Sequence, residues 1–517
     1  MKYFGIDFGN GTCSISSIDE NGEYLELLKN DSGEDKIKSK IAFKDLENVI
    51  VGKEKLNDDS LENIELIKSK FGIERSVIVK GEKRSIQYCG AILMNYLITN
   101  IAKENLLKKA VITIPAIYGQ RDRRVIYDAA LQASIENVEL IEEPSAAALY
   151  YIYEQYRNNR KNIMKESDIL IFDFGTGTLD MSLINVNYND KGINASVKAT
   201  EGKRNLGGYL IDILLAEFLL EMYIEEFEDE YFEKVKIILT NYINKYNTNQ
   251  YSYLNNIDKK DRDFIEELIL YAETIKKDLS NNDRVEVKIG KYEESIITRN
   301  DFERYVIDNG ISSKINELID KFNLNNSSKI DEIVMVGGSS QIPYIKEILQ
   351  KKFKNKQITT NSSYINAVSL GAAIASALNS EASIKPFGQN RCNGILPNNI
   401  YLSFNGEDNL IFKKGTSYPY SKIMEVKIPY SLCSSIEVLV KENNEIIDKM
   451  NFYHPCFYTG DILNLYCNID EKGIMMFKAE HKESKESITV EIESKNRLTV
   501  KQIEAGKNNI RKNINYI

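Results

Sequence analysis

A short motif occurs twice in this chain, and it constrains the fold more than any other feature of the sequence. Residues 4–16 read FGIDFGNGTCSIS and residues 170–184 read LIFDFGTGTLDMSLI. In each copy an apolar run delivers an aspartate, Asp7 or Asp173, into a glycine-containing turn, and an extended stretch follows. Because such an apolar run is typical of a buried strand, each copy predicts a β-hairpin. Two similar hairpins predict two related lobes.

The turns of the two hairpins have the chemistry of a phosphate site. They consist of Gly9, Asn10, Gly11 and Thr12 in the first copy and Gly175, Thr176, Gly177 and Thr178 in the second. Glycine lets backbone N–H groups approach a ligand closely, and several inward-pointing N–H groups bind an anion. The aspartate beside each turn would repel a phosphate unless a cation lay between them, which favours Mg²⁺-phosphate. One copy alone would be an ordinary hairpin, but two could hold one polyphosphate from opposite sides.

Two further stretches supply charged groups for the same ligand. SLENIELIKSKFG predicts a helix that carries Lys68, a cation that could meet a γ-phosphate or the attacking water. VELIEEPSAAAL leaves Glu143 where a strand meets a helix, a usual place for a carboxylate that positions water. Taken alone, Lys68 fits a solvated surface lysine and Glu143 fits a charge at a helix N-terminus.

Another two stretches could hold a nucleoside. AETIKKDLSNN predicts one polar helical face, made of Glu273, Lys276, Lys277 and Ser280. EIVMVGGSSQIP predicts a buried strand that runs into Gly337 and Gly338, where the backbone could pass closely over a nucleotide. The alternatives are a solvated helix face and a plain strand-to-helix turn.

Composition excludes several classes of protein. A chain of 517 residues exceeds one hydrophobic core, so two or more domains are expected. The net charge of −9 argues against a nucleic-acid binder, and no apolar run approaches membrane-spanning length. Six cysteines without a C-x-x-C pair favour the reducing cytoplasm. The two histidines, His454 and His481, lie far from the motifs, which argues against a Ser-His-Asp triad.

The predicted secondary structure changes in character once along the chain. Residues 1–380 alternate strand-like and helical stretches and end in the small-residue helix AVSLGAAIASAL, which predicts an α/β domain. Residues 381–394 form a linker, and short alternating runs over 395–500 predict an all-β sandwich or barrel. Residues 501–517 leave room for a tail with one short helix at most.

Taken in order, these stretches resemble the seventy-kilodalton heat-shock chaperones, the DnaK-like family within the actin and sugar-kinase superfamily. AVITIPAIYGQRDRRVIYDAA followed by EEPSAAAL is especially similar, and ITRNDFE and VGGSSQIP also match. LIFKKGTSYPYSK and NIDEKGIMMFKAEHKESKESITVEI resemble the peptide-binding β-sandwich of that family. The resemblance implies an α/β actin-like bilobed ATPase domain followed by an all-β sandwich substrate-binding domain.

The resemblance also implies roles for individual residues. Mg²⁺ would be held, largely through water, by Asp7, Glu143 and Asp173. Lys68 and Thr178 would lie beside the γ-phosphate and the attacking water, and Asp180 would support that water or an associated K⁺. The nucleoside would be bound by Glu273, Lys276, Lys277, Ser280, Gly337, Gly338 and Ser339. Pro115 and Arg123 match the family's relay between nucleotide and peptide domain.

The chain departs from the family pattern at several points. Asn10 and Gly11 stand where the first hairpin usually has threonines, Gln341 replaces an arginine and Ile365 replaces an acidic residue. The linker segment NSEASIKPFGQ lacks the usual acidic, leucine-rich run, and we expect no counterpart of the family's helical lid.

Three functions follow from these features. The first is an ATP-dependent molecular chaperone of the cytoplasm, an ATPase that converts Mg-ATP to ADP and phosphate to control the binding of unfolded or extended polypeptides. Protein folding and the stress response would be its setting, and J-domain proteins and nucleotide exchange factors its partners. The second is a nucleotide-switched scaffold with one dedicated partner and slow or lost hydrolysis. A small-molecule kinase of the same superfold, the third, gives the β-rich segment no role.

Overall fold

The computed structural model describes residues 1–53, 60–158, 166–189, 192–325, 330–360, 365–380, 382, 384–388, 392–428, 433–485, 487–494 and 497–517. Within the predicted linker, residues 381, 383 and 389–391 lie outside the described residues.

Two sheets of the same strand order form the centre of residues 1–360. The first runs β11-β10-β1-β2-β3, with β4 paired to β2, and the second runs β14-β13-β12-β17-β18. The first contains β1 (Lys2–Phe8), β2 (Thr12–Asp19), β3 (Leu25–Leu27), β4 (Ile37–Lys38), β10 (Leu107–Ile114) and β11 (Ile135–Glu142). The second contains β12 (Glu166–Phe174), β13 (Thr178–Asn189), β14 (Gly192–Arg204), β17 (Glu332–Val336) and β18 (Gln357–Thr359).

The repeated motif occupies the same place in both sheets. Its first strand, β1 or β12, is central, pairs antiparallel with the next strand and pairs parallel with a strand from much later in the chain. We call residues 1–158 the first lobe and residues 166–360 the second lobe. The two motifs thus begin two related sheets, as the prediction of two related lobes requires.

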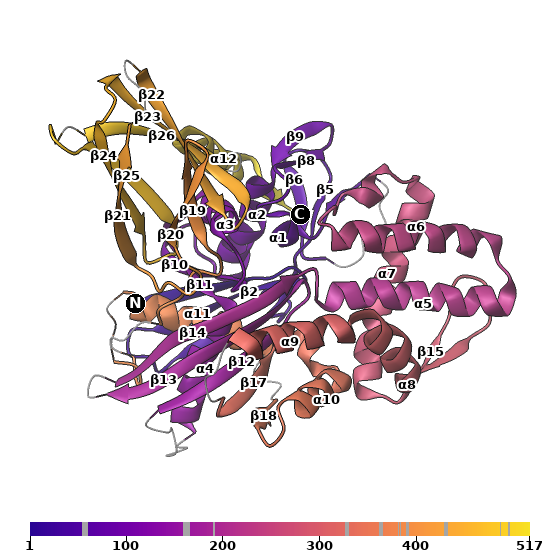
Figure 1. Ribbon diagram of the computed structural model, residues 1–517. Helices are drawn as coiled ribbons and strands as arrows, with labels where there is room; N and C mark the ends of the chain where they lie inside the picture. The colour runs from indigo at the N-terminus through magenta and orange to yellow at the C-terminus, as the bar shows by residue number, and fades with distance from the viewer. Residues whose placement is uncertain are drawn as a thin grey trace.

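Helices built from small residues fill the space between the two sheets. α4 (Glu143–Arg157) packs against α11 (Ala367–Leu378), and their buried alanines share one core with residues of both sheets (Figure 1). A Cβ at Gly371 would lie 1.7 Å from the carbonyl oxygen of Ala146, and a Cβ at Gly5 would lie 2.2 Å from the nitrogen of Ala373. The small-residue helix predicted near residue 370 is therefore required by close backbone packing.

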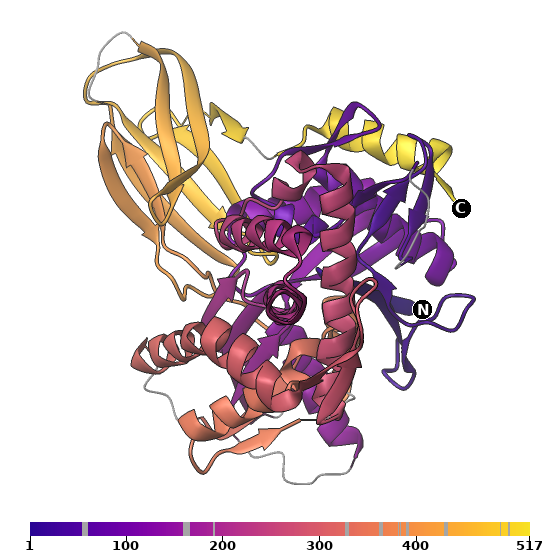
Figure 2. The same ribbon diagram turned by 90° about the vertical axis from the view of Figure 1, so that its right-hand side faces the viewer.

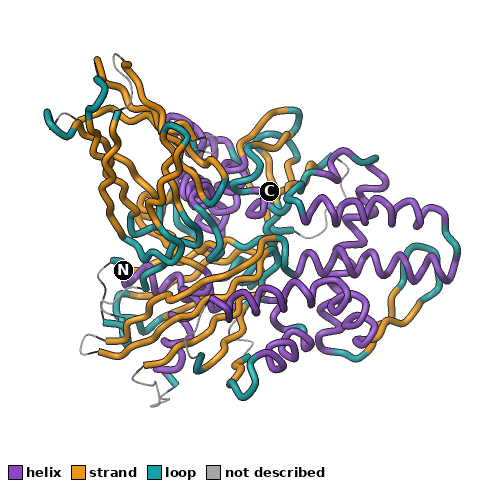
Figure 3. The backbone as a smooth tube through the Cα atoms, in the orientation of Figure 1, coloured by secondary structure: helices purple, strands orange, loops and turns teal. Residues whose placement is uncertain are grey.

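The remaining helices and small sheets surround the central sheets of the two lobes. The first lobe has α1 (Ile67–Lys70), α2 (Ile86–Tyr96), α3 (Gln120–Gln132), β5 (Ile41–Phe43), β6 (Asn48–Val51), β7 (Glu62–Ile64), β8 (Ser76–Val79) and β9 (Glu82–Ser85). The second has α5 (Gly208–Phe227), α6 (Glu230–Asn247), α7 (Lys259–Asn281), α8 (Arg299–Asp301), α9 (Ser313–Asn325), α10 (Pro343–Lys352), β15 (Arg284–Val287) and β16 (Ser295–Thr298). Long helices dominate the right-hand side of the molecule in Figure 3.

The helix predicted over SLENIELIKSKFG is wrong for its first half. Residues 62–64 form β7, which pairs with β5, and only α1 is helical. Leu66, between the two, has a φ of 53° in the left-handed region, which no helix interior accommodates. Pairing with β5 through Ile64 and Ile41 overrides the helical periodicity.

An all-β unit, which we call the β-module (residues 395–494), follows α11. Its eight strands run β20-β19-β22-β23-β26-β25-β24-β21 and are all antiparallel. They are β19 (Ile400–Phe404), β20 (Glu407–Phe412), β21 (Tyr420–Lys427), β22 (Cys433–Glu442), β23 (Glu445–Phe457), β24 (Ile462–Ile469), β25 (Met475–His481) and β26 (Ser487–Ser494). The β-module has a hydrophobic core of its own, separate from those of the lobes.

The chain then returns to the first lobe. α12 (Val500–Asn513) packs on α3 and α2, and Ile510 is buried in the core of the first lobe (Figure 2). β27 (Asn515–Tyr516) pairs in parallel with β6, so that one sheet runs β27-β6-β5-β7. α12 lies where the sequence left room for one short helix. The strand β27 was not predicted, because two residues are too few to show a periodic pattern.

Candidate functional site

The tips of the two motif hairpins face each other across the lobes. A Cβ at Gly11 would lie 2.4 Å from the hydroxyl of Thr176, and a Cβ at Gly177 would lie 2.0 Å from the side-chain nitrogen of Asn10. A side chain at either glycine would therefore have to displace the facing side chain of the opposite hairpin. The structure therefore brings the two predicted phosphate turns together.

A buried ion pair lies beside the turns. The Lys68 ammonium, 1% exposed, contacts Oε1 of Glu143. Lys68 comes from α1, and Glu143 is the first residue of α4. The predicted solvated lysine is thus excluded, and the two charged groups meet although 75 residues separate them.

Three aspartates complete the cluster. Asp7 accepts a hydrogen bond of 3.0 Å from Thr113 Oγ1, and Asp180 accepts one of 3.2 Å from the backbone N–H of Ile117. Asp173 lies opposite Asp180 in the β12–β13 register. One buried oxygen of Asp173 and one of Asp180 have no hydrogen-bond partner among the described residues.

Crowding of carboxylates changes their protonation. Burial, followed by the charges of Glu143, Asp180 and Asp7, raises the pKa of Asp173 well above its usual value. Burial and the charge of Glu143 raise the pKa of Asp180 to about 7, although Thr178 donates a hydrogen bond to it. Burial also raises the pKa of Glu143, against the lowering effect of Lys68. Such a cluster of carboxylates favours a cation.

The donor set fits a hydrated Mg²⁺ better than a directly ligated ion. No three His, Cys, Asp or Glu side chains of the described residues are close enough to hold a metal directly. The orphaned oxygens of Asp173 and Asp180 are acceptors that water molecules around a cation could satisfy. That the ion is held largely through water stays a prediction.

The predicted nucleoside face of α7 divides into separate environments. Glu273 receives both hydrogen bonds of Lys38, at 3.0 and 2.9 Å, and pairs with Lys277 at 2.7 Å. Lys276 is buried against Asp212 of α5 at 2.6 Å. The Ser280 hydroxyl donates to the carbonyl oxygen of Lys276 in its own helix. The lysines beside it hold the pKa of Glu273 down to about 2 despite its burial.

The glycine pair after β17 comes close to the second hairpin. Gly337 has a φ of 85°, and a Cβ there would lie 2.8 Å from Oδ1 of Asp173. The Ser339 hydroxyl donates to the carbonyl oxygen of Gly175 at 2.9 Å. Gly338, in contrast, is exposed and has open space around its Cα. Gly337 thus packs closely on the second hairpin, and the passage of this backbone over a nucleotide stays a prediction.

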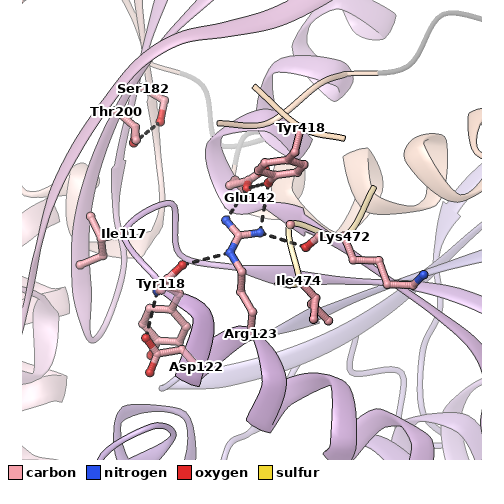
Figure 4. Close-up of polar contacts among 12 residues, drawn as sticks. Ile117, Tyr118, Asp122, Arg123, Glu142, Ser182, Thr200, Tyr418, Lys472 and Ile474 are labelled. Carbon is pink, nitrogen blue, oxygen red and sulfur yellow. Dashed lines mark hydrogen bonds and ion pairs between the residues drawn. The ribbon is translucent and has the colours of Figure 1, made fainter. Parts of the chain in front are cut away.

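Arg123, which matches one of the family's relay residues, lies where the β-module meets the first lobe (Figure 4). Arg123, fully buried, donates to Glu142 at 2.6 Å, to the hydroxyl of Tyr418 at 3.0 Å and to the carbonyl oxygen of Lys472 at 3.1 Å. The carbonyl oxygen of Pro115 accepts from the N–H of Tyr118, a short turn before Arg123. Arg123 therefore joins two regions that are distant in sequence.

The residues that depart from the family pattern have identifiable environments. Asn10 accepts a hydrogen bond of 2.9 Å from Ser69 and so supports α1. Gln341 is exposed, and the carbonyl oxygen of Ile365 accepts from Lys36 at 3.0 Å. Asn10 thus has a structural role that a threonine would fill differently, because its side chain is longer.

Lys38, Tyr118 and Arg204 were not predicted from the sequence as residues of the site. Lys38 bridges the lobes to Glu273, Tyr118 donates to the carbonyl oxygen of Lys68, and Arg204 packs on Tyr118. A lysine in a two-residue strand carries no periodic signal, and Arg204 follows no motif. Tyr118, within the matched stretch AVITIPAIYGQRDRR, had the strongest signal of the three.

No helix among the described residues is both long and apolar enough to cross a lipid bilayer.

Comparison with known proteins agrees with this geometry. The Hsp70 protein family matches the chain over residues 65–239 and 233–388. The chain is 28% identical over 389 residues to "Chaperone protein DnaK" of Mycoplasma mycoides subsp. mycoides SC. That similarity covers 72% of this chain but only 58% of the relative. By the extent of the family match, the chain belongs to the Hsp70 family.

Proposed function

We propose that the chain is an ATP-dependent chaperone whose two lobes form an actin-like, bilobed ATPase domain. One observation carries this proposal: two glycine hairpins meet tip to tip beside a buried Lys68–Glu143 pair and the carboxylates of Asp7, Asp173 and Asp180. Transfer of a phosphoryl group to water needs positioning and charge neutralisation rather than a covalent nucleophile. This constellation provides both without a histidine.

Each residue has a task in the proposed reaction. The backbone N–H groups of the two turns hold phosphate oxygens, and Lys68 approaches the γ-phosphate as a cation while Glu143 orients it. Thr178 and Asp180 hold the attacking water, and the Asp180 carboxylate accepts its proton. Bound Mg²⁺, held through water by Asp7, Glu143 and Asp173, would neutralise the charge of the phosphates. Lys276, Glu273 and the turn at Gly337 border the nucleoside.

The β-module would bind extended polypeptide segments by backbone hydrogen bonds and side-chain pockets. The proposed domains are 1–380, 381–394, 395–500 and 501–517. J-domain proteins and exchange factors are the proposed helpers, as in the family. Because Cys13, Cys89 and Cys467 are buried and form no disulfide, the cytoplasm is the proposed compartment.

A nucleotide-switched scaffold is the second candidate, and the contacts of the β-module favour it. Arg123, Gln120 and α12 tie this unit and its following segment to the first lobe. If these contacts persist in every nucleotide state, the β-module cannot release a peptide in response to ATP.

Two measurements test the proposal. Titration calorimetry of the full chain with Mg-ATP should detect binding, and single-turnover assays should detect ADP and phosphate. The off-rate of a fluorescent extended peptide should rise with ATP for a chaperone and stay constant for a scaffold. Absence of heat with both ATP and ADP would remove the nucleotide site from either function.

A further inference from the structure

The turn that carries Lys68 cannot support itself. α1 has four residues, and a single helical turn is unstable without outside contacts. Leu66, which precedes it, is held in a left-handed conformation that is unfavourable for a residue with a branched side chain. The position of Lys68 therefore depends on the residues that contact this turn from elsewhere.

Besides the Lys68–Glu143 ion pair, three contacts hold the turn in place. Ser69 donates to Asn10, and the ring of Phe71 stacks on Phe8 with a centroid distance of 5.6 Å. The third contact falls on Lys68 itself, because the Tyr118 hydroxyl donates to its carbonyl oxygen at 3.1 Å. Tyr118 is 1% exposed, and burial raises its pKa well above the usual value, so it remains a donor.

A residue of the second lobe holds Tyr118. The guanidinium carbon of Arg204 lies 4.3 Å from the centroid of the Tyr118 ring. The same guanidinium pairs with Asp122 of α3. Arg204 lies opposite Thr178 in the β13–β14 register, so it starts beside the second phosphate turn and reaches the first lobe.

We propose that Tyr118 is a positioning residue for Lys68, and that Arg204 makes this positioning depend on the closure of the two lobes. The proposal rests on the proposed ATPase function. A cation over a buried ring is strongly attracted, and the ring in turn aims a hydroxyl at the turn carrying Lys68. Opening of the lobes would withdraw Arg204 and loosen the turn.

Tyr118→Phe tests the role of the hydroxyl, because it removes one oxygen and keeps the ring. A single hydrogen bond of this kind is worth up to about a tenfold change in rate. We expect the single-turnover rate of ATP hydrolysis to fall about tenfold while the Kd for Mg-ATP stays within twofold. Tyr24→Phe, at a tyrosine that is 74% exposed, is the matched control and should change neither quantity.

Arg204→Lys tests the contribution of the second lobe, because lysine keeps the charge and loses the planar stacking group. We expect a rate close to that of Tyr118→Phe, and the double variant should be no slower than the slower single variant. Fully additive losses would show that the two residues act separately and would overturn the dependence on lobe closure.

Hydrogen exchange of the nucleotide-free full chain gives a readout without activity. In Tyr118→Phe the amides of residues 67–71 should exchange faster, and those of α2 should not. If ATP binds and is hydrolysed at the wild-type rate in Tyr118→Phe with unchanged exchange, this inference fails and the proposed function stands. If wild-type protein binds no ATP, the function fails, while exchange still decides whether Tyr118 holds the turn.

Discussion

The two lobes share one strand order, and each places a buried lysine against a buried carboxylate. The two lysines differ in the length of the helix that carries them. Lys68 of the first lobe pairs with Glu143 from a four-residue turn. Lys276 of the second lobe pairs with Asp212 from the 23-residue helix α7. A short turn can be shifted by its neighbours, whereas a long packed helix is rigid. Under the proposed function, Lys68 acts in hydrolysis and Lys276 acts in nucleotide binding.

Removal of the two lysines should have opposite effects. Lys68→Ala should lower turnover by about a hundredfold or more, because one preorganised charge is worth that much, with ATP binding nearly unchanged. Lys276→Ala should weaken ATP binding and leave turnover at saturating ATP nearly intact. Calorimetry and single-turnover kinetics separate these effects. Equal losses of binding and turnover in both variants would show that the two lysines do not divide these tasks.

The first lobe should also depend on residues from the far end of the described chain. Ile510 of α12 is 1% exposed within its core, so Ile510→Ala should destabilise the lobe by about 2–5 kcal/mol. Val500→Ala in the same helix, at a side chain 78% exposed, should cost less than about 0.5 kcal/mol. Native-state hydrogen exchange of α2 measures the change in stability of the first lobe in both variants. An equal response in α2 and α7 would mean that α12 does not act on the first lobe specifically.

Two glutamates of α7 should give opposite pH dependence. Burial and the charge of Glu65 raise the pKa of Glu266 from 4.5 to about 7. Between these values the unfolded chain is ionised and the folded chain is protonated, so stability falls as pH rises. Glu266→Gln should reduce the fall in the free energy of unfolding between pH 4.5 and 7 by about 1–2 kcal/mol. Urea unfolding at several pH values measures it.

Glu273 changes stability with pH in the opposite direction. Its folded pKa of about 2 lies below its usual value of 4.5, so its contribution is complete above pH 4.5 and is lost as pH falls toward 2. Glu266→Gln should leave that acid limb unchanged. A wild-type stability that stays flat from pH 4.5 to 7 would refute the assignment to Glu266.

The bridge between Lys38 and Glu273 should have the smallest effect. The pair is about one quarter exposed, and such pairs contribute about 1 kcal/mol at most. Lys38→Ala should speed the dissociation of nucleotide by about fivefold, less so at high salt. Stopped-flow release of a fluorescent nucleotide measures the rate. Lys2→Ala, which breaks the exposed pair with Glu26, is the control and should leave release unchanged.

Much of the site could be predicted from local patterns. The motifs at Asp7 and Asp173 are contiguous in sequence, and their hairpins formed with the aspartates at the strand ends. Glu143 was predicted where a strand meets a helix, and it is the first residue of α4. The helix assigned around Lys68 was wrong over residues 62–64, because pairing with β5 overrode the local preference.

Local patterns were enough to predict two hairpins with glycine turns, a small-residue helix and a run of alternating strands. The contacts of Arg204 with Tyr118, of Lys38 with Glu273 and of β27 with β6 exist only in the folded chain. Periodicity and turn chemistry act over a few neighbouring residues, whereas these contacts join residues that only the packed core brings together. The residue type of one partner therefore does not predict which residue it will contact.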